Sequence, residues 1–198
     1  FSDEPVVSFC PEGHGYCSLV RRNNRVKQQW LSMLLLAPML LLEAPLLARS
    51  LFDRPPTRVV IHNPEATEGL RNRTTITVVV PEDAGNALGS IVLRQLPNID
   101  QWDWGRSQPQ VYFGDYSLRR KGASGLASAV VSDADGLVSI KLTPAVQPGQ
   151  TVNVVFRGFN PESSIYQWST ELLAEGEEPV RYVGPTLRLT VYEQDPFR

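Results

Sequence analysis

The sequence has 198 residues, of which 42% are hydrophobic and 20% charged, and its formal net charge is −2. This length allows one domain and a leader, and the apolar content argues against a chain that is disordered throughout. The slightly negative charge argues against nucleic acid as a partner, because nucleic acids attract basic faces. Residues 51–198 contain no cysteine and one histidine, His62. The sequence therefore predicts no catalytic residue, no metal site and no cofactor.

The segment after residue 20 has the organisation of a secretory signal. Four positive charges within residues 21–27 precede an uncharged apolar run, Leu31–Leu42, and small residues follow. This order defines a signal peptide. Ala48 and Ser50 fit the −3 and −1 positions, which predicts cleavage after Ser50, with cleavage after Ala48 as the alternative. We expect residues 21–50 to form a hydrophobic signal helix and the rest of the chain to be exported.

An uncleaved membrane anchor is the alternative interpretation of this leader. A span needs about 20 apolar residues, and a segment of that length would have to include Glu43, Pro38 and Pro45. Contact with the membrane through the leader is therefore expected to be transient unless the leader stays uncleaved.

Residues 1–20 do not fit a signal peptide. We interpret them as an upstream or disordered extension, with Val20, directly before the basic region, as a GTG start codon. Cys10 and Cys17 flank His14 in this stretch. Their C-x6-C spacing is not that of a standard zinc knuckle and no second ligand pair exists, so no metal site is predicted there.

Residues 51–57 form a proline-containing lead-in, which we interpret as a linker, and short β-runs separated by turn residues follow. Asp133–Gly136 indicates a hairpin, and residues 64–71 could form one turn or a short helix. Many short strands with Gly and Pro turns predict an all-β fold. We expect an immunoglobulin-like antiparallel β-sandwich of about seven to nine strands over residues 58–193, followed by a tail, 194–198. The nine predicted runs are Arg58–His62, Thr74–Val80, Ser90–Leu96, Gln110–Phe113, Ala127–Ser132, Leu137–Leu142, Thr151–Phe156, Tyr166–Ala174 and Leu187–Tyr192.

An aromatic cluster is the most unusual feature of the predicted domain. Trp102, Asp103 and Trp104 lie in the long connection ahead of the fourth run, with Tyr112 and Tyr116 nearby. The rings could stack on sugar faces while Asp103 accepts hydroxyl hydrogen bonds, or they could anchor a protein interface. The Trp pair could instead cover an open end of the sandwich as a core plug, which is the interpretation we favour. These five residues are the candidate ligand or partner surface.

Two further features have a plain structural interpretation beside a functional one. His62 could serve a Ser-His-Asp arrangement, but the nucleophile-elbow pattern G-x-S-x-G is absent, and we expect a structural histidine. The basic run Arg119–Lys121 is expected to be an exposed loop. Contact with an acidic partner or with lipid headgroups is its alternative function.

Three stretches together resemble a known family. They are Val59–Gly69 (VVIHNPEATEG), Thr77–Gln95 and Val146–Glu193, the last with a Pro-Gly turn, a strand, Asn-Pro, a Tyr-led strand, Gly and a final strand. This pattern resembles the exported cyanobacterial proteins grouped as domain of unknown function 2808, over most of residues 58–193. The resemblance implies an exported β-domain and names no activity.

These observations predict an exported, non-enzymatic module with a structural or protein-interaction role in the cell envelope. A glycan-binding envelope module is one alternative, and it requires exposed, near-coplanar Trp102 and Trp104. A membrane-anchored assembly factor that keeps its leader is another. A hydrolase would need His62 to meet a serine or a carboxylate in a cleft. In a source like that of the family, periplasm, thylakoid lumen and outer envelope all fit.

Overall fold

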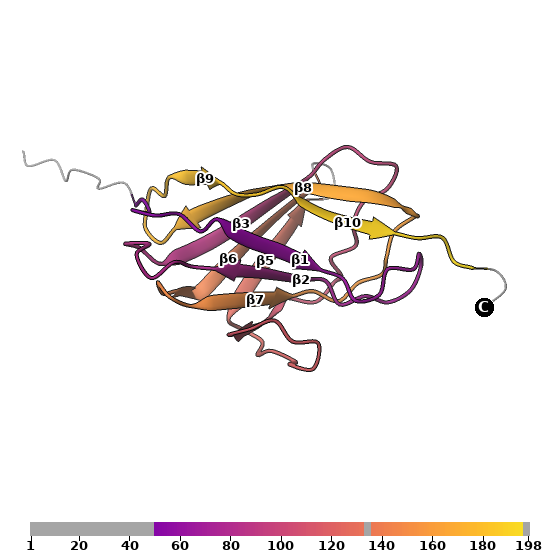
Figure 1. Ribbon diagram of the computed structural model, residues 1–198, viewed down its shortest axis with the longest axis horizontal. Helices are drawn as coiled ribbons and strands as arrows, with labels where there is room; N and C mark the ends of the chain where they lie inside the picture. Colours follow the sequence, from indigo (N-terminus) through magenta and orange to yellow (C-terminus); the bar gives the residue numbers. More distant parts are fainter. Residues whose placement is uncertain (1–49, 133–135, 196–198) are drawn as a thin grey trace, which may run out of the picture. The chain divides into compact units, whose positions relative to one another are not determined.

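The computed structural model describes residues 50–132 and 136–195, which form two antiparallel β-sheets (Figure 1). One sheet has four strands in the order β1-β2-β7-β4, and the other has six, in the order β10-β8-β3-β6-β5 with β9 paired to β8. No helix that could span a membrane occurs within these residues. The strands are β1 (Arg58–His62), β2 (Thr75–Val79), β3 (Leu88–Gln95), β4 (Gln110–Phe113), β5 (Ala127–Ser132), β6 (Leu137–Val146), β7 (Thr151–Val155), β8 (Ser164–Ala174), β9 (Arg181–Val183) and β10 (Leu187–Val191).

The predicted immunoglobulin-like sandwich is confirmed, and every predicted β-run forms a strand. Strand β9 was missed and brings the described strands to ten, because three residues are too few to show an alternating pattern. Residues 64–71 form a turn with isolated bridges rather than a helix. Strands β5 and β6 pair as the predicted hairpin requires. The predicted signal helix and residues 1–20 lie outside the described residues.

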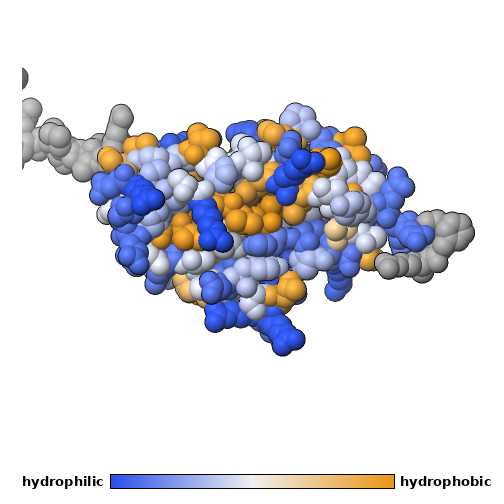
Figure 2. Space-filling model, in the orientation of Figure 1, coloured by the Kyte–Doolittle hydropathy of each residue, from blue (hydrophilic) through white to orange (hydrophobic). Residues whose placement is uncertain are grey.

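Alternating apolar residues give each sheet one hydrophobic face. Along β8, Tyr166, Trp168, Thr170 and Leu172 are buried while the residues that alternate with them are partly exposed, because side chains alternate across a strand. Figure 2 shows hydrophobic residues gathered in the middle of one side of the domain and hydrophilic residues around them. The two hydrophobic faces pack on each other and form one core.

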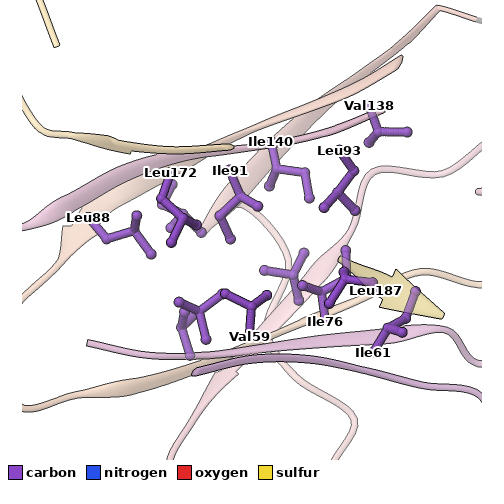
Figure 3. Close-up of a cluster of buried hydrophobic side chains, with 14 of the residues drawn as sticks. Val59, Ile61, Ile76, Leu88, Ile91, Leu93, Val138, Ile140, Leu172 and Leu187 are labelled. Atoms are coloured by element: carbon purple, nitrogen blue, oxygen red, sulfur yellow. The ribbon is translucent and has the colours of Figure 1, made fainter. Parts of the chain in front are cut away.

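Figure 3 shows how the two sheets meet in this core. Ile91, Leu93 and Ile140 of the six-stranded sheet point toward Val59 and Ile76 of the four-stranded sheet, and all five are buried. Removing one such side chain from water contributes about 1.5–3 kcal/mol. Since residues 51–198 contain no cysteine, this burial holds the sheets together without a disulfide.

The residues ahead of β1 also pack on the sandwich. The carbonyl of Ser50 accepts a hydrogen bond from the backbone N–H of Val180 at 2.9 Å. Phe52 is buried, and its ring meets the ring of Tyr182 edge-on with centroids 5.3 Å apart. The folded sandwich therefore includes Ser50 and Phe52.

Strand β5 forms one edge of the six-stranded sheet. It carries no charge, and its Val130 side chain is 71% exposed. At Ala129 the edge is occupied by a side chain: the Gln108 carbonyl oxygen accepts from the Ala129 N–H at 2.7 Å, and the Gln108 amide donates to the Ala129 carbonyl at 3.4 Å. Gln108 thus makes the two bonds that a neighbouring strand would make at this residue.

Candidate functional site

Three connections meet at one end of the sandwich, on the right in Figure 1. They are residues 63–74 between β1 and β2, 96–109 between β3 and β4, and 156–163 between β7 and β8. Backbone bonds join the first and the third of these connections, since the N–H of Asn72 donates to the carbonyl of Gly158 at 3.0 Å. We call these three connections the loop end.

The two predicted tryptophans lie under the loop end. Trp102 and Trp104 are each 4% exposed. The Trp102 ring packs edge-on against Tyr166 and Trp168 with centroids 5.5 and 5.3 Å away, and the Trp104 ring packs against Phe156 at 5.0 Å. This is the arrangement that the core-plug interpretation describes. The exposed pair that carbohydrate stacking requires is not formed, because the large indole surfaces are removed from water by the core.

A buried polar chain connects Trp102 to the other two connections. The indole N–H of Trp102 donates to the Thr74 hydroxyl at 3.1 Å, and this hydroxyl donates to the Asn72 carbonyl oxygen at 3.0 Å. The Asn72 amide in turn donates to the Asn160 carbonyl oxygen at 2.7 Å. Every member is buried, so each bond matters, because a buried polar group without a partner is costly.

Asn160 is the centre of this hydrogen-bond network. Its carbonyl oxygen accepts from the amides of Asn63 and Asn72 at 2.9 and 2.7 Å. Its own amide donates to the backbone carbonyls of Glu65 and Thr67, both at 2.7 Å. The side chain thereby uses both lone pairs and both amide hydrogens. In the sequence, Asn160 stood only as part of the Asn-Pro pair of the family pattern, so this role was missed.

Two glycines let the connections 96–109 and 156–163 touch through their backbones. A Cβ on Gly105, whose φ is +77°, would lie 2.0 Å from the Arg157 carbonyl oxygen, and one on Gly158 would lie 2.2 Å from that of Asp103. The Asp103 carboxylate fastens the contact, accepting from the Gly105 N–H at 2.7 Å and the Phe159 N–H at 2.9 Å. Asp103 therefore has a structural task that the sequence did not indicate.

This backbone presents an exposed aromatic ring among cations. Phe159 is 48% exposed, and the guanidinium carbon of Arg71 lies 5.4 Å from its ring centroid. Arg106 and Arg157 are exposed beside it and, with Asp103, line adjoining hollows of about 280 and 530 Å³. Within residues 50–132 and 136–195 none of the three arginines has an ion-pair partner. We call Arg71, Arg106, Arg157 and Phe159 the arginine groove.

The two predicted tyrosines lie elsewhere, on the outer face of the four-stranded sheet. Side chains alternate along β4, so Val111 points into the core and Tyr112 points out. The Tyr116 ring stacks on His62 with centroids 3.7 Å apart and an interplanar angle of 12°. The five candidate residues therefore do not form one surface.

His62 is held by this stacking and not by a catalytic partner. Burial of the imidazole lowers the pKa of His62, because removal from water disfavours the charged form. Its side chain makes no hydrogen bond with a hydroxyl or a carboxylate of the described residues. Those residues also contain no group of three His, Cys, Asp or Glu side chains that could hold a metal ion.

Comparison with known proteins places the chain in a family. The family described as protein of unknown function, DUF2808, matches residues 50–191, and no curated protein matches. An uncharacterized protein from Nocardia farcinica with an immunoglobulin-like fold is 20% identical, covers 67% of this chain and 96% of that one, and has a TM-score of 0.42. The major pilin SpaD from Corynebacterium diphtheriae is 11% identical, with coverages of 67% and 34% and a TM-score of 0.44. A collagen-binding domain from a Staphylococcus aureus adhesin is 9% identical, with 68% and 96% covered and a TM-score of 0.36. These likenesses concern the fold alone.

Proposed function

This chain belongs to the DUF2808 family of proteins of unknown function, so the family does not indicate its role. From the residues on its surface, we propose that it is an exported, non-catalytic binding module that binds a protein partner at the arginine groove. The observation that carries the proposal is the exposed Phe159 ring beside three guanidinium groups that have no ion-pair partner among the described residues, on a backbone that hydrogen bonds hold in place.

The residue types of the groove are those that dominate protein interfaces. Aromatic and arginine side chains are enriched among the residues that contribute most to binding. The Asp103 and Asn160 bonds already order the backbone that carries Phe159. Less conformational freedom is then lost on association, which favours affinity.

The charges of the groove indicate the chemistry of the partner. Arg71, Arg106 and Arg157 outnumber the single carboxylate of Asp103 on the rim. Guanidinium groups bind carboxylates with paired, charge-assisted hydrogen bonds. The partner therefore presents Asp or Glu side chains around an apolar side chain that covers Phe159.

A non-catalytic role and export each have separate support. The His62 imidazole stacks on Tyr116, and among the residues that the structure describes it makes no hydrogen bond with the serine or carboxylate that a hydrolase would need. The family match begins at residue 50, where the predicted signal peptide ends. If the leader is cleaved, the domain is released into the periplasm, the lumen or the envelope; if it stays, the same domain serves as a membrane-anchored assembly factor.

A crosslinked pull-down of tagged protein from the native envelope tests this proposal. The variants Phe159→Ala and Arg157→Gln alter the groove, while Val183→Ala on β9 and Arg188→Gln on β10 remove one exposed apolar and one exposed cationic side chain elsewhere. We expect one stoichiometric protein partner with the wild type and both controls, and a loss of at least about tenfold with each groove variant.

Thermal unfolding of all four variants checks that the fold is retained, since changes at exposed positions usually alter stability by within about 0.5 kcal/mol. Recovery of no protein partner, or a partner retained by the groove variants, would show that the arginine groove is not the binding surface.

A further inference from the structure

The connection after β4, residues 114–126, is pinned to the outer face of the four-stranded sheet. We call it the β4–β5 loop. The Tyr116 ring stacks on His62. The Tyr112 hydroxyl accepts a hydrogen bond from the Ser117 N–H at 3.0 Å and lies 3.2 Å from the Ser117 carbonyl, to which it donates. These contacts fix the path of the loop before its basic run begins.

Two arginines donate hydrogen bonds to backbone carbonyls of the loop and of the strand end before it. The Arg73 guanidinium donates to the carbonyls of Ser117, Leu118 and Arg120. The Arg120 guanidinium donates to the Phe113 carbonyl at 2.5 Å. The carbonyls of Ser117, Leu118 and Arg120 are therefore already bonded within the domain, and the Arg120 guanidinium is engaged with the carbonyl just before the loop.

The side chains that remain face outward. Leu118 is 57% exposed, and Arg119 and Lys121 are exposed. Neither of these two cationic groups has a hydrogen-bond or ion-pair partner in the part of the chain that the structure describes. The lower margin of the domain in Figure 2, where Figure 1 draws this loop below β7, consists of strongly hydrophilic residues with hydrophobic surface beside them.

We propose that the β4–β5 loop docks on an anionic lipid surface, with Leu118 entering the headgroup region and Arg119 and Lys121 contacting lipid phosphates. Basic side chains are attracted to anionic leaflets, and an adjacent apolar side chain adds burial at the interface. The chain as a whole has a net charge of −2. The attraction is therefore local and orients the domain with this loop toward the membrane.

The bonded backbone favours lipid over an acidic protein as the occupant. Entry into a headgroup layer removes water from main-chain carbonyls, and this costs free energy where they lack partners. Arg73 already supplies partners to the carbonyls on both sides of Arg119. A lipid surface also accepts the Leu118 side chain without a matching pocket, which a protein partner would have to provide.

Vesicle binding of the full chain tests this proposal. Sedimentation is compared between vesicles of equal parts phosphatidylglycerol and phosphatidylcholine and vesicles of phosphatidylcholine alone. The apolar run of residues 31–42 is the same in every variant, so the differences between variants report on the loop. The double variant Arg119→Gln/Lys121→Gln is matched by Arg58→Gln/Arg188→Gln, which removes two exposed arginines elsewhere.

We expect the loop variant to bind anionic vesicles about 30-fold more weakly, because each cation near an anionic surface contributes about fivefold. Leu118→Ser should also weaken binding, the matched variant should bind within about twofold of wild type, and added salt should reduce the difference. Equal binding to both vesicle types, or equal losses in the loop and matched variants, would overturn the proposal. Binding to polyglutamate without binding to anionic vesicles would instead identify an acidic protein as the occupant.

Discussion

Removal of the Asn160 side chain is expected to be the most informative perturbation of the loop end. Asn160→Ala eliminates four hydrogen bonds, to the amides of Asn63 and Asn72 and to the carbonyls of Glu65 and Thr67. Asn160 is 4% exposed, so water replaces few of these bonds. At a net contribution of about 1 kcal/mol per bond, and with some rehydration near the surface, we expect a loss of about 3 kcal/mol.

Urea unfolding followed by tryptophan fluorescence measures this loss, because the series of buried hydrogen bonds that starts at Asn160 ends at the Trp102 indole. The matched control is Asn98→Ala. Asn98 makes three side-chain bonds, against four for Asn160, to Ile99, Ser164 and Ile165, at a more exposed position. It should lose about 1 kcal/mol, since water can take over its bonds.

The variant Asn160→Asp separates the two halves of the network. A carboxylate can still accept from the amides of Asn63 and Asn72 but cannot donate to the carbonyls of Glu65 and Thr67. It also places a charge against these two oxygens, so the loss should equal or exceed that of Asn160→Ala. A loss below about 1 kcal/mol for Asn160→Ala, or one no larger than for Asn98→Ala, would refute the view that Asn160 holds the loop end together.

Two further predictions concern the outer face and the start of the folded unit. Burial lowers the pKa of His62 in the folded protein below its ordinary value of 6.5. The unfolded chain therefore binds the proton more tightly, and stability should fall as the pH drops below about 6.5. Thermal unfolding between pH 5 and 8 should show this fall in the wild type and a smaller fall in His62→Phe, which keeps a ring against Tyr116. A protein that begins at Leu51 lacks the bond from Val180 to the Ser50 carbonyl and should be about 1 kcal/mol less stable in calorimetry than one that begins at Ser50, whereas equal stability would show that Ser50 is dispensable.

The strands could be predicted from the sequence because each one is determined largely by its own residues and the turn residues beside it. Runs such as Arg58–His62 and Gln110–Phe113 combine β-branched or aromatic residues with flanking turn residues, and the structure forms both with the predicted bounds. Strand β9 carries no such signal in three residues. It exists because β8 is long enough to pair with it beyond the end of β10.

The candidate site was harder to predict because it is made by tertiary contacts. Whether the indole of Trp104 faces water or the core depends on where the connection between β3 and β4 crosses the sandwich. A single sequence does not contain this information in any local pattern. The arginine groove likewise depends on the pairing of Arg71 with Phe159. In the sequence, Phe159 is one aromatic residue between a glycine and an asparagine, and no periodic pattern marks it.

The amide of Gln108 has a consequence for the behaviour of the protein in a crowded compartment. An uncharged edge strand such as β5 is a template on which another chain can add its own strand, and repeated addition leads to aggregates. The Gln108 side chain occupies the N–H and carbonyl of Ala129, two of the groups that such an incoming strand would need. One side chain from the connection between β3 and β4 thus blocks the addition of another strand at this point of the six-stranded sheet.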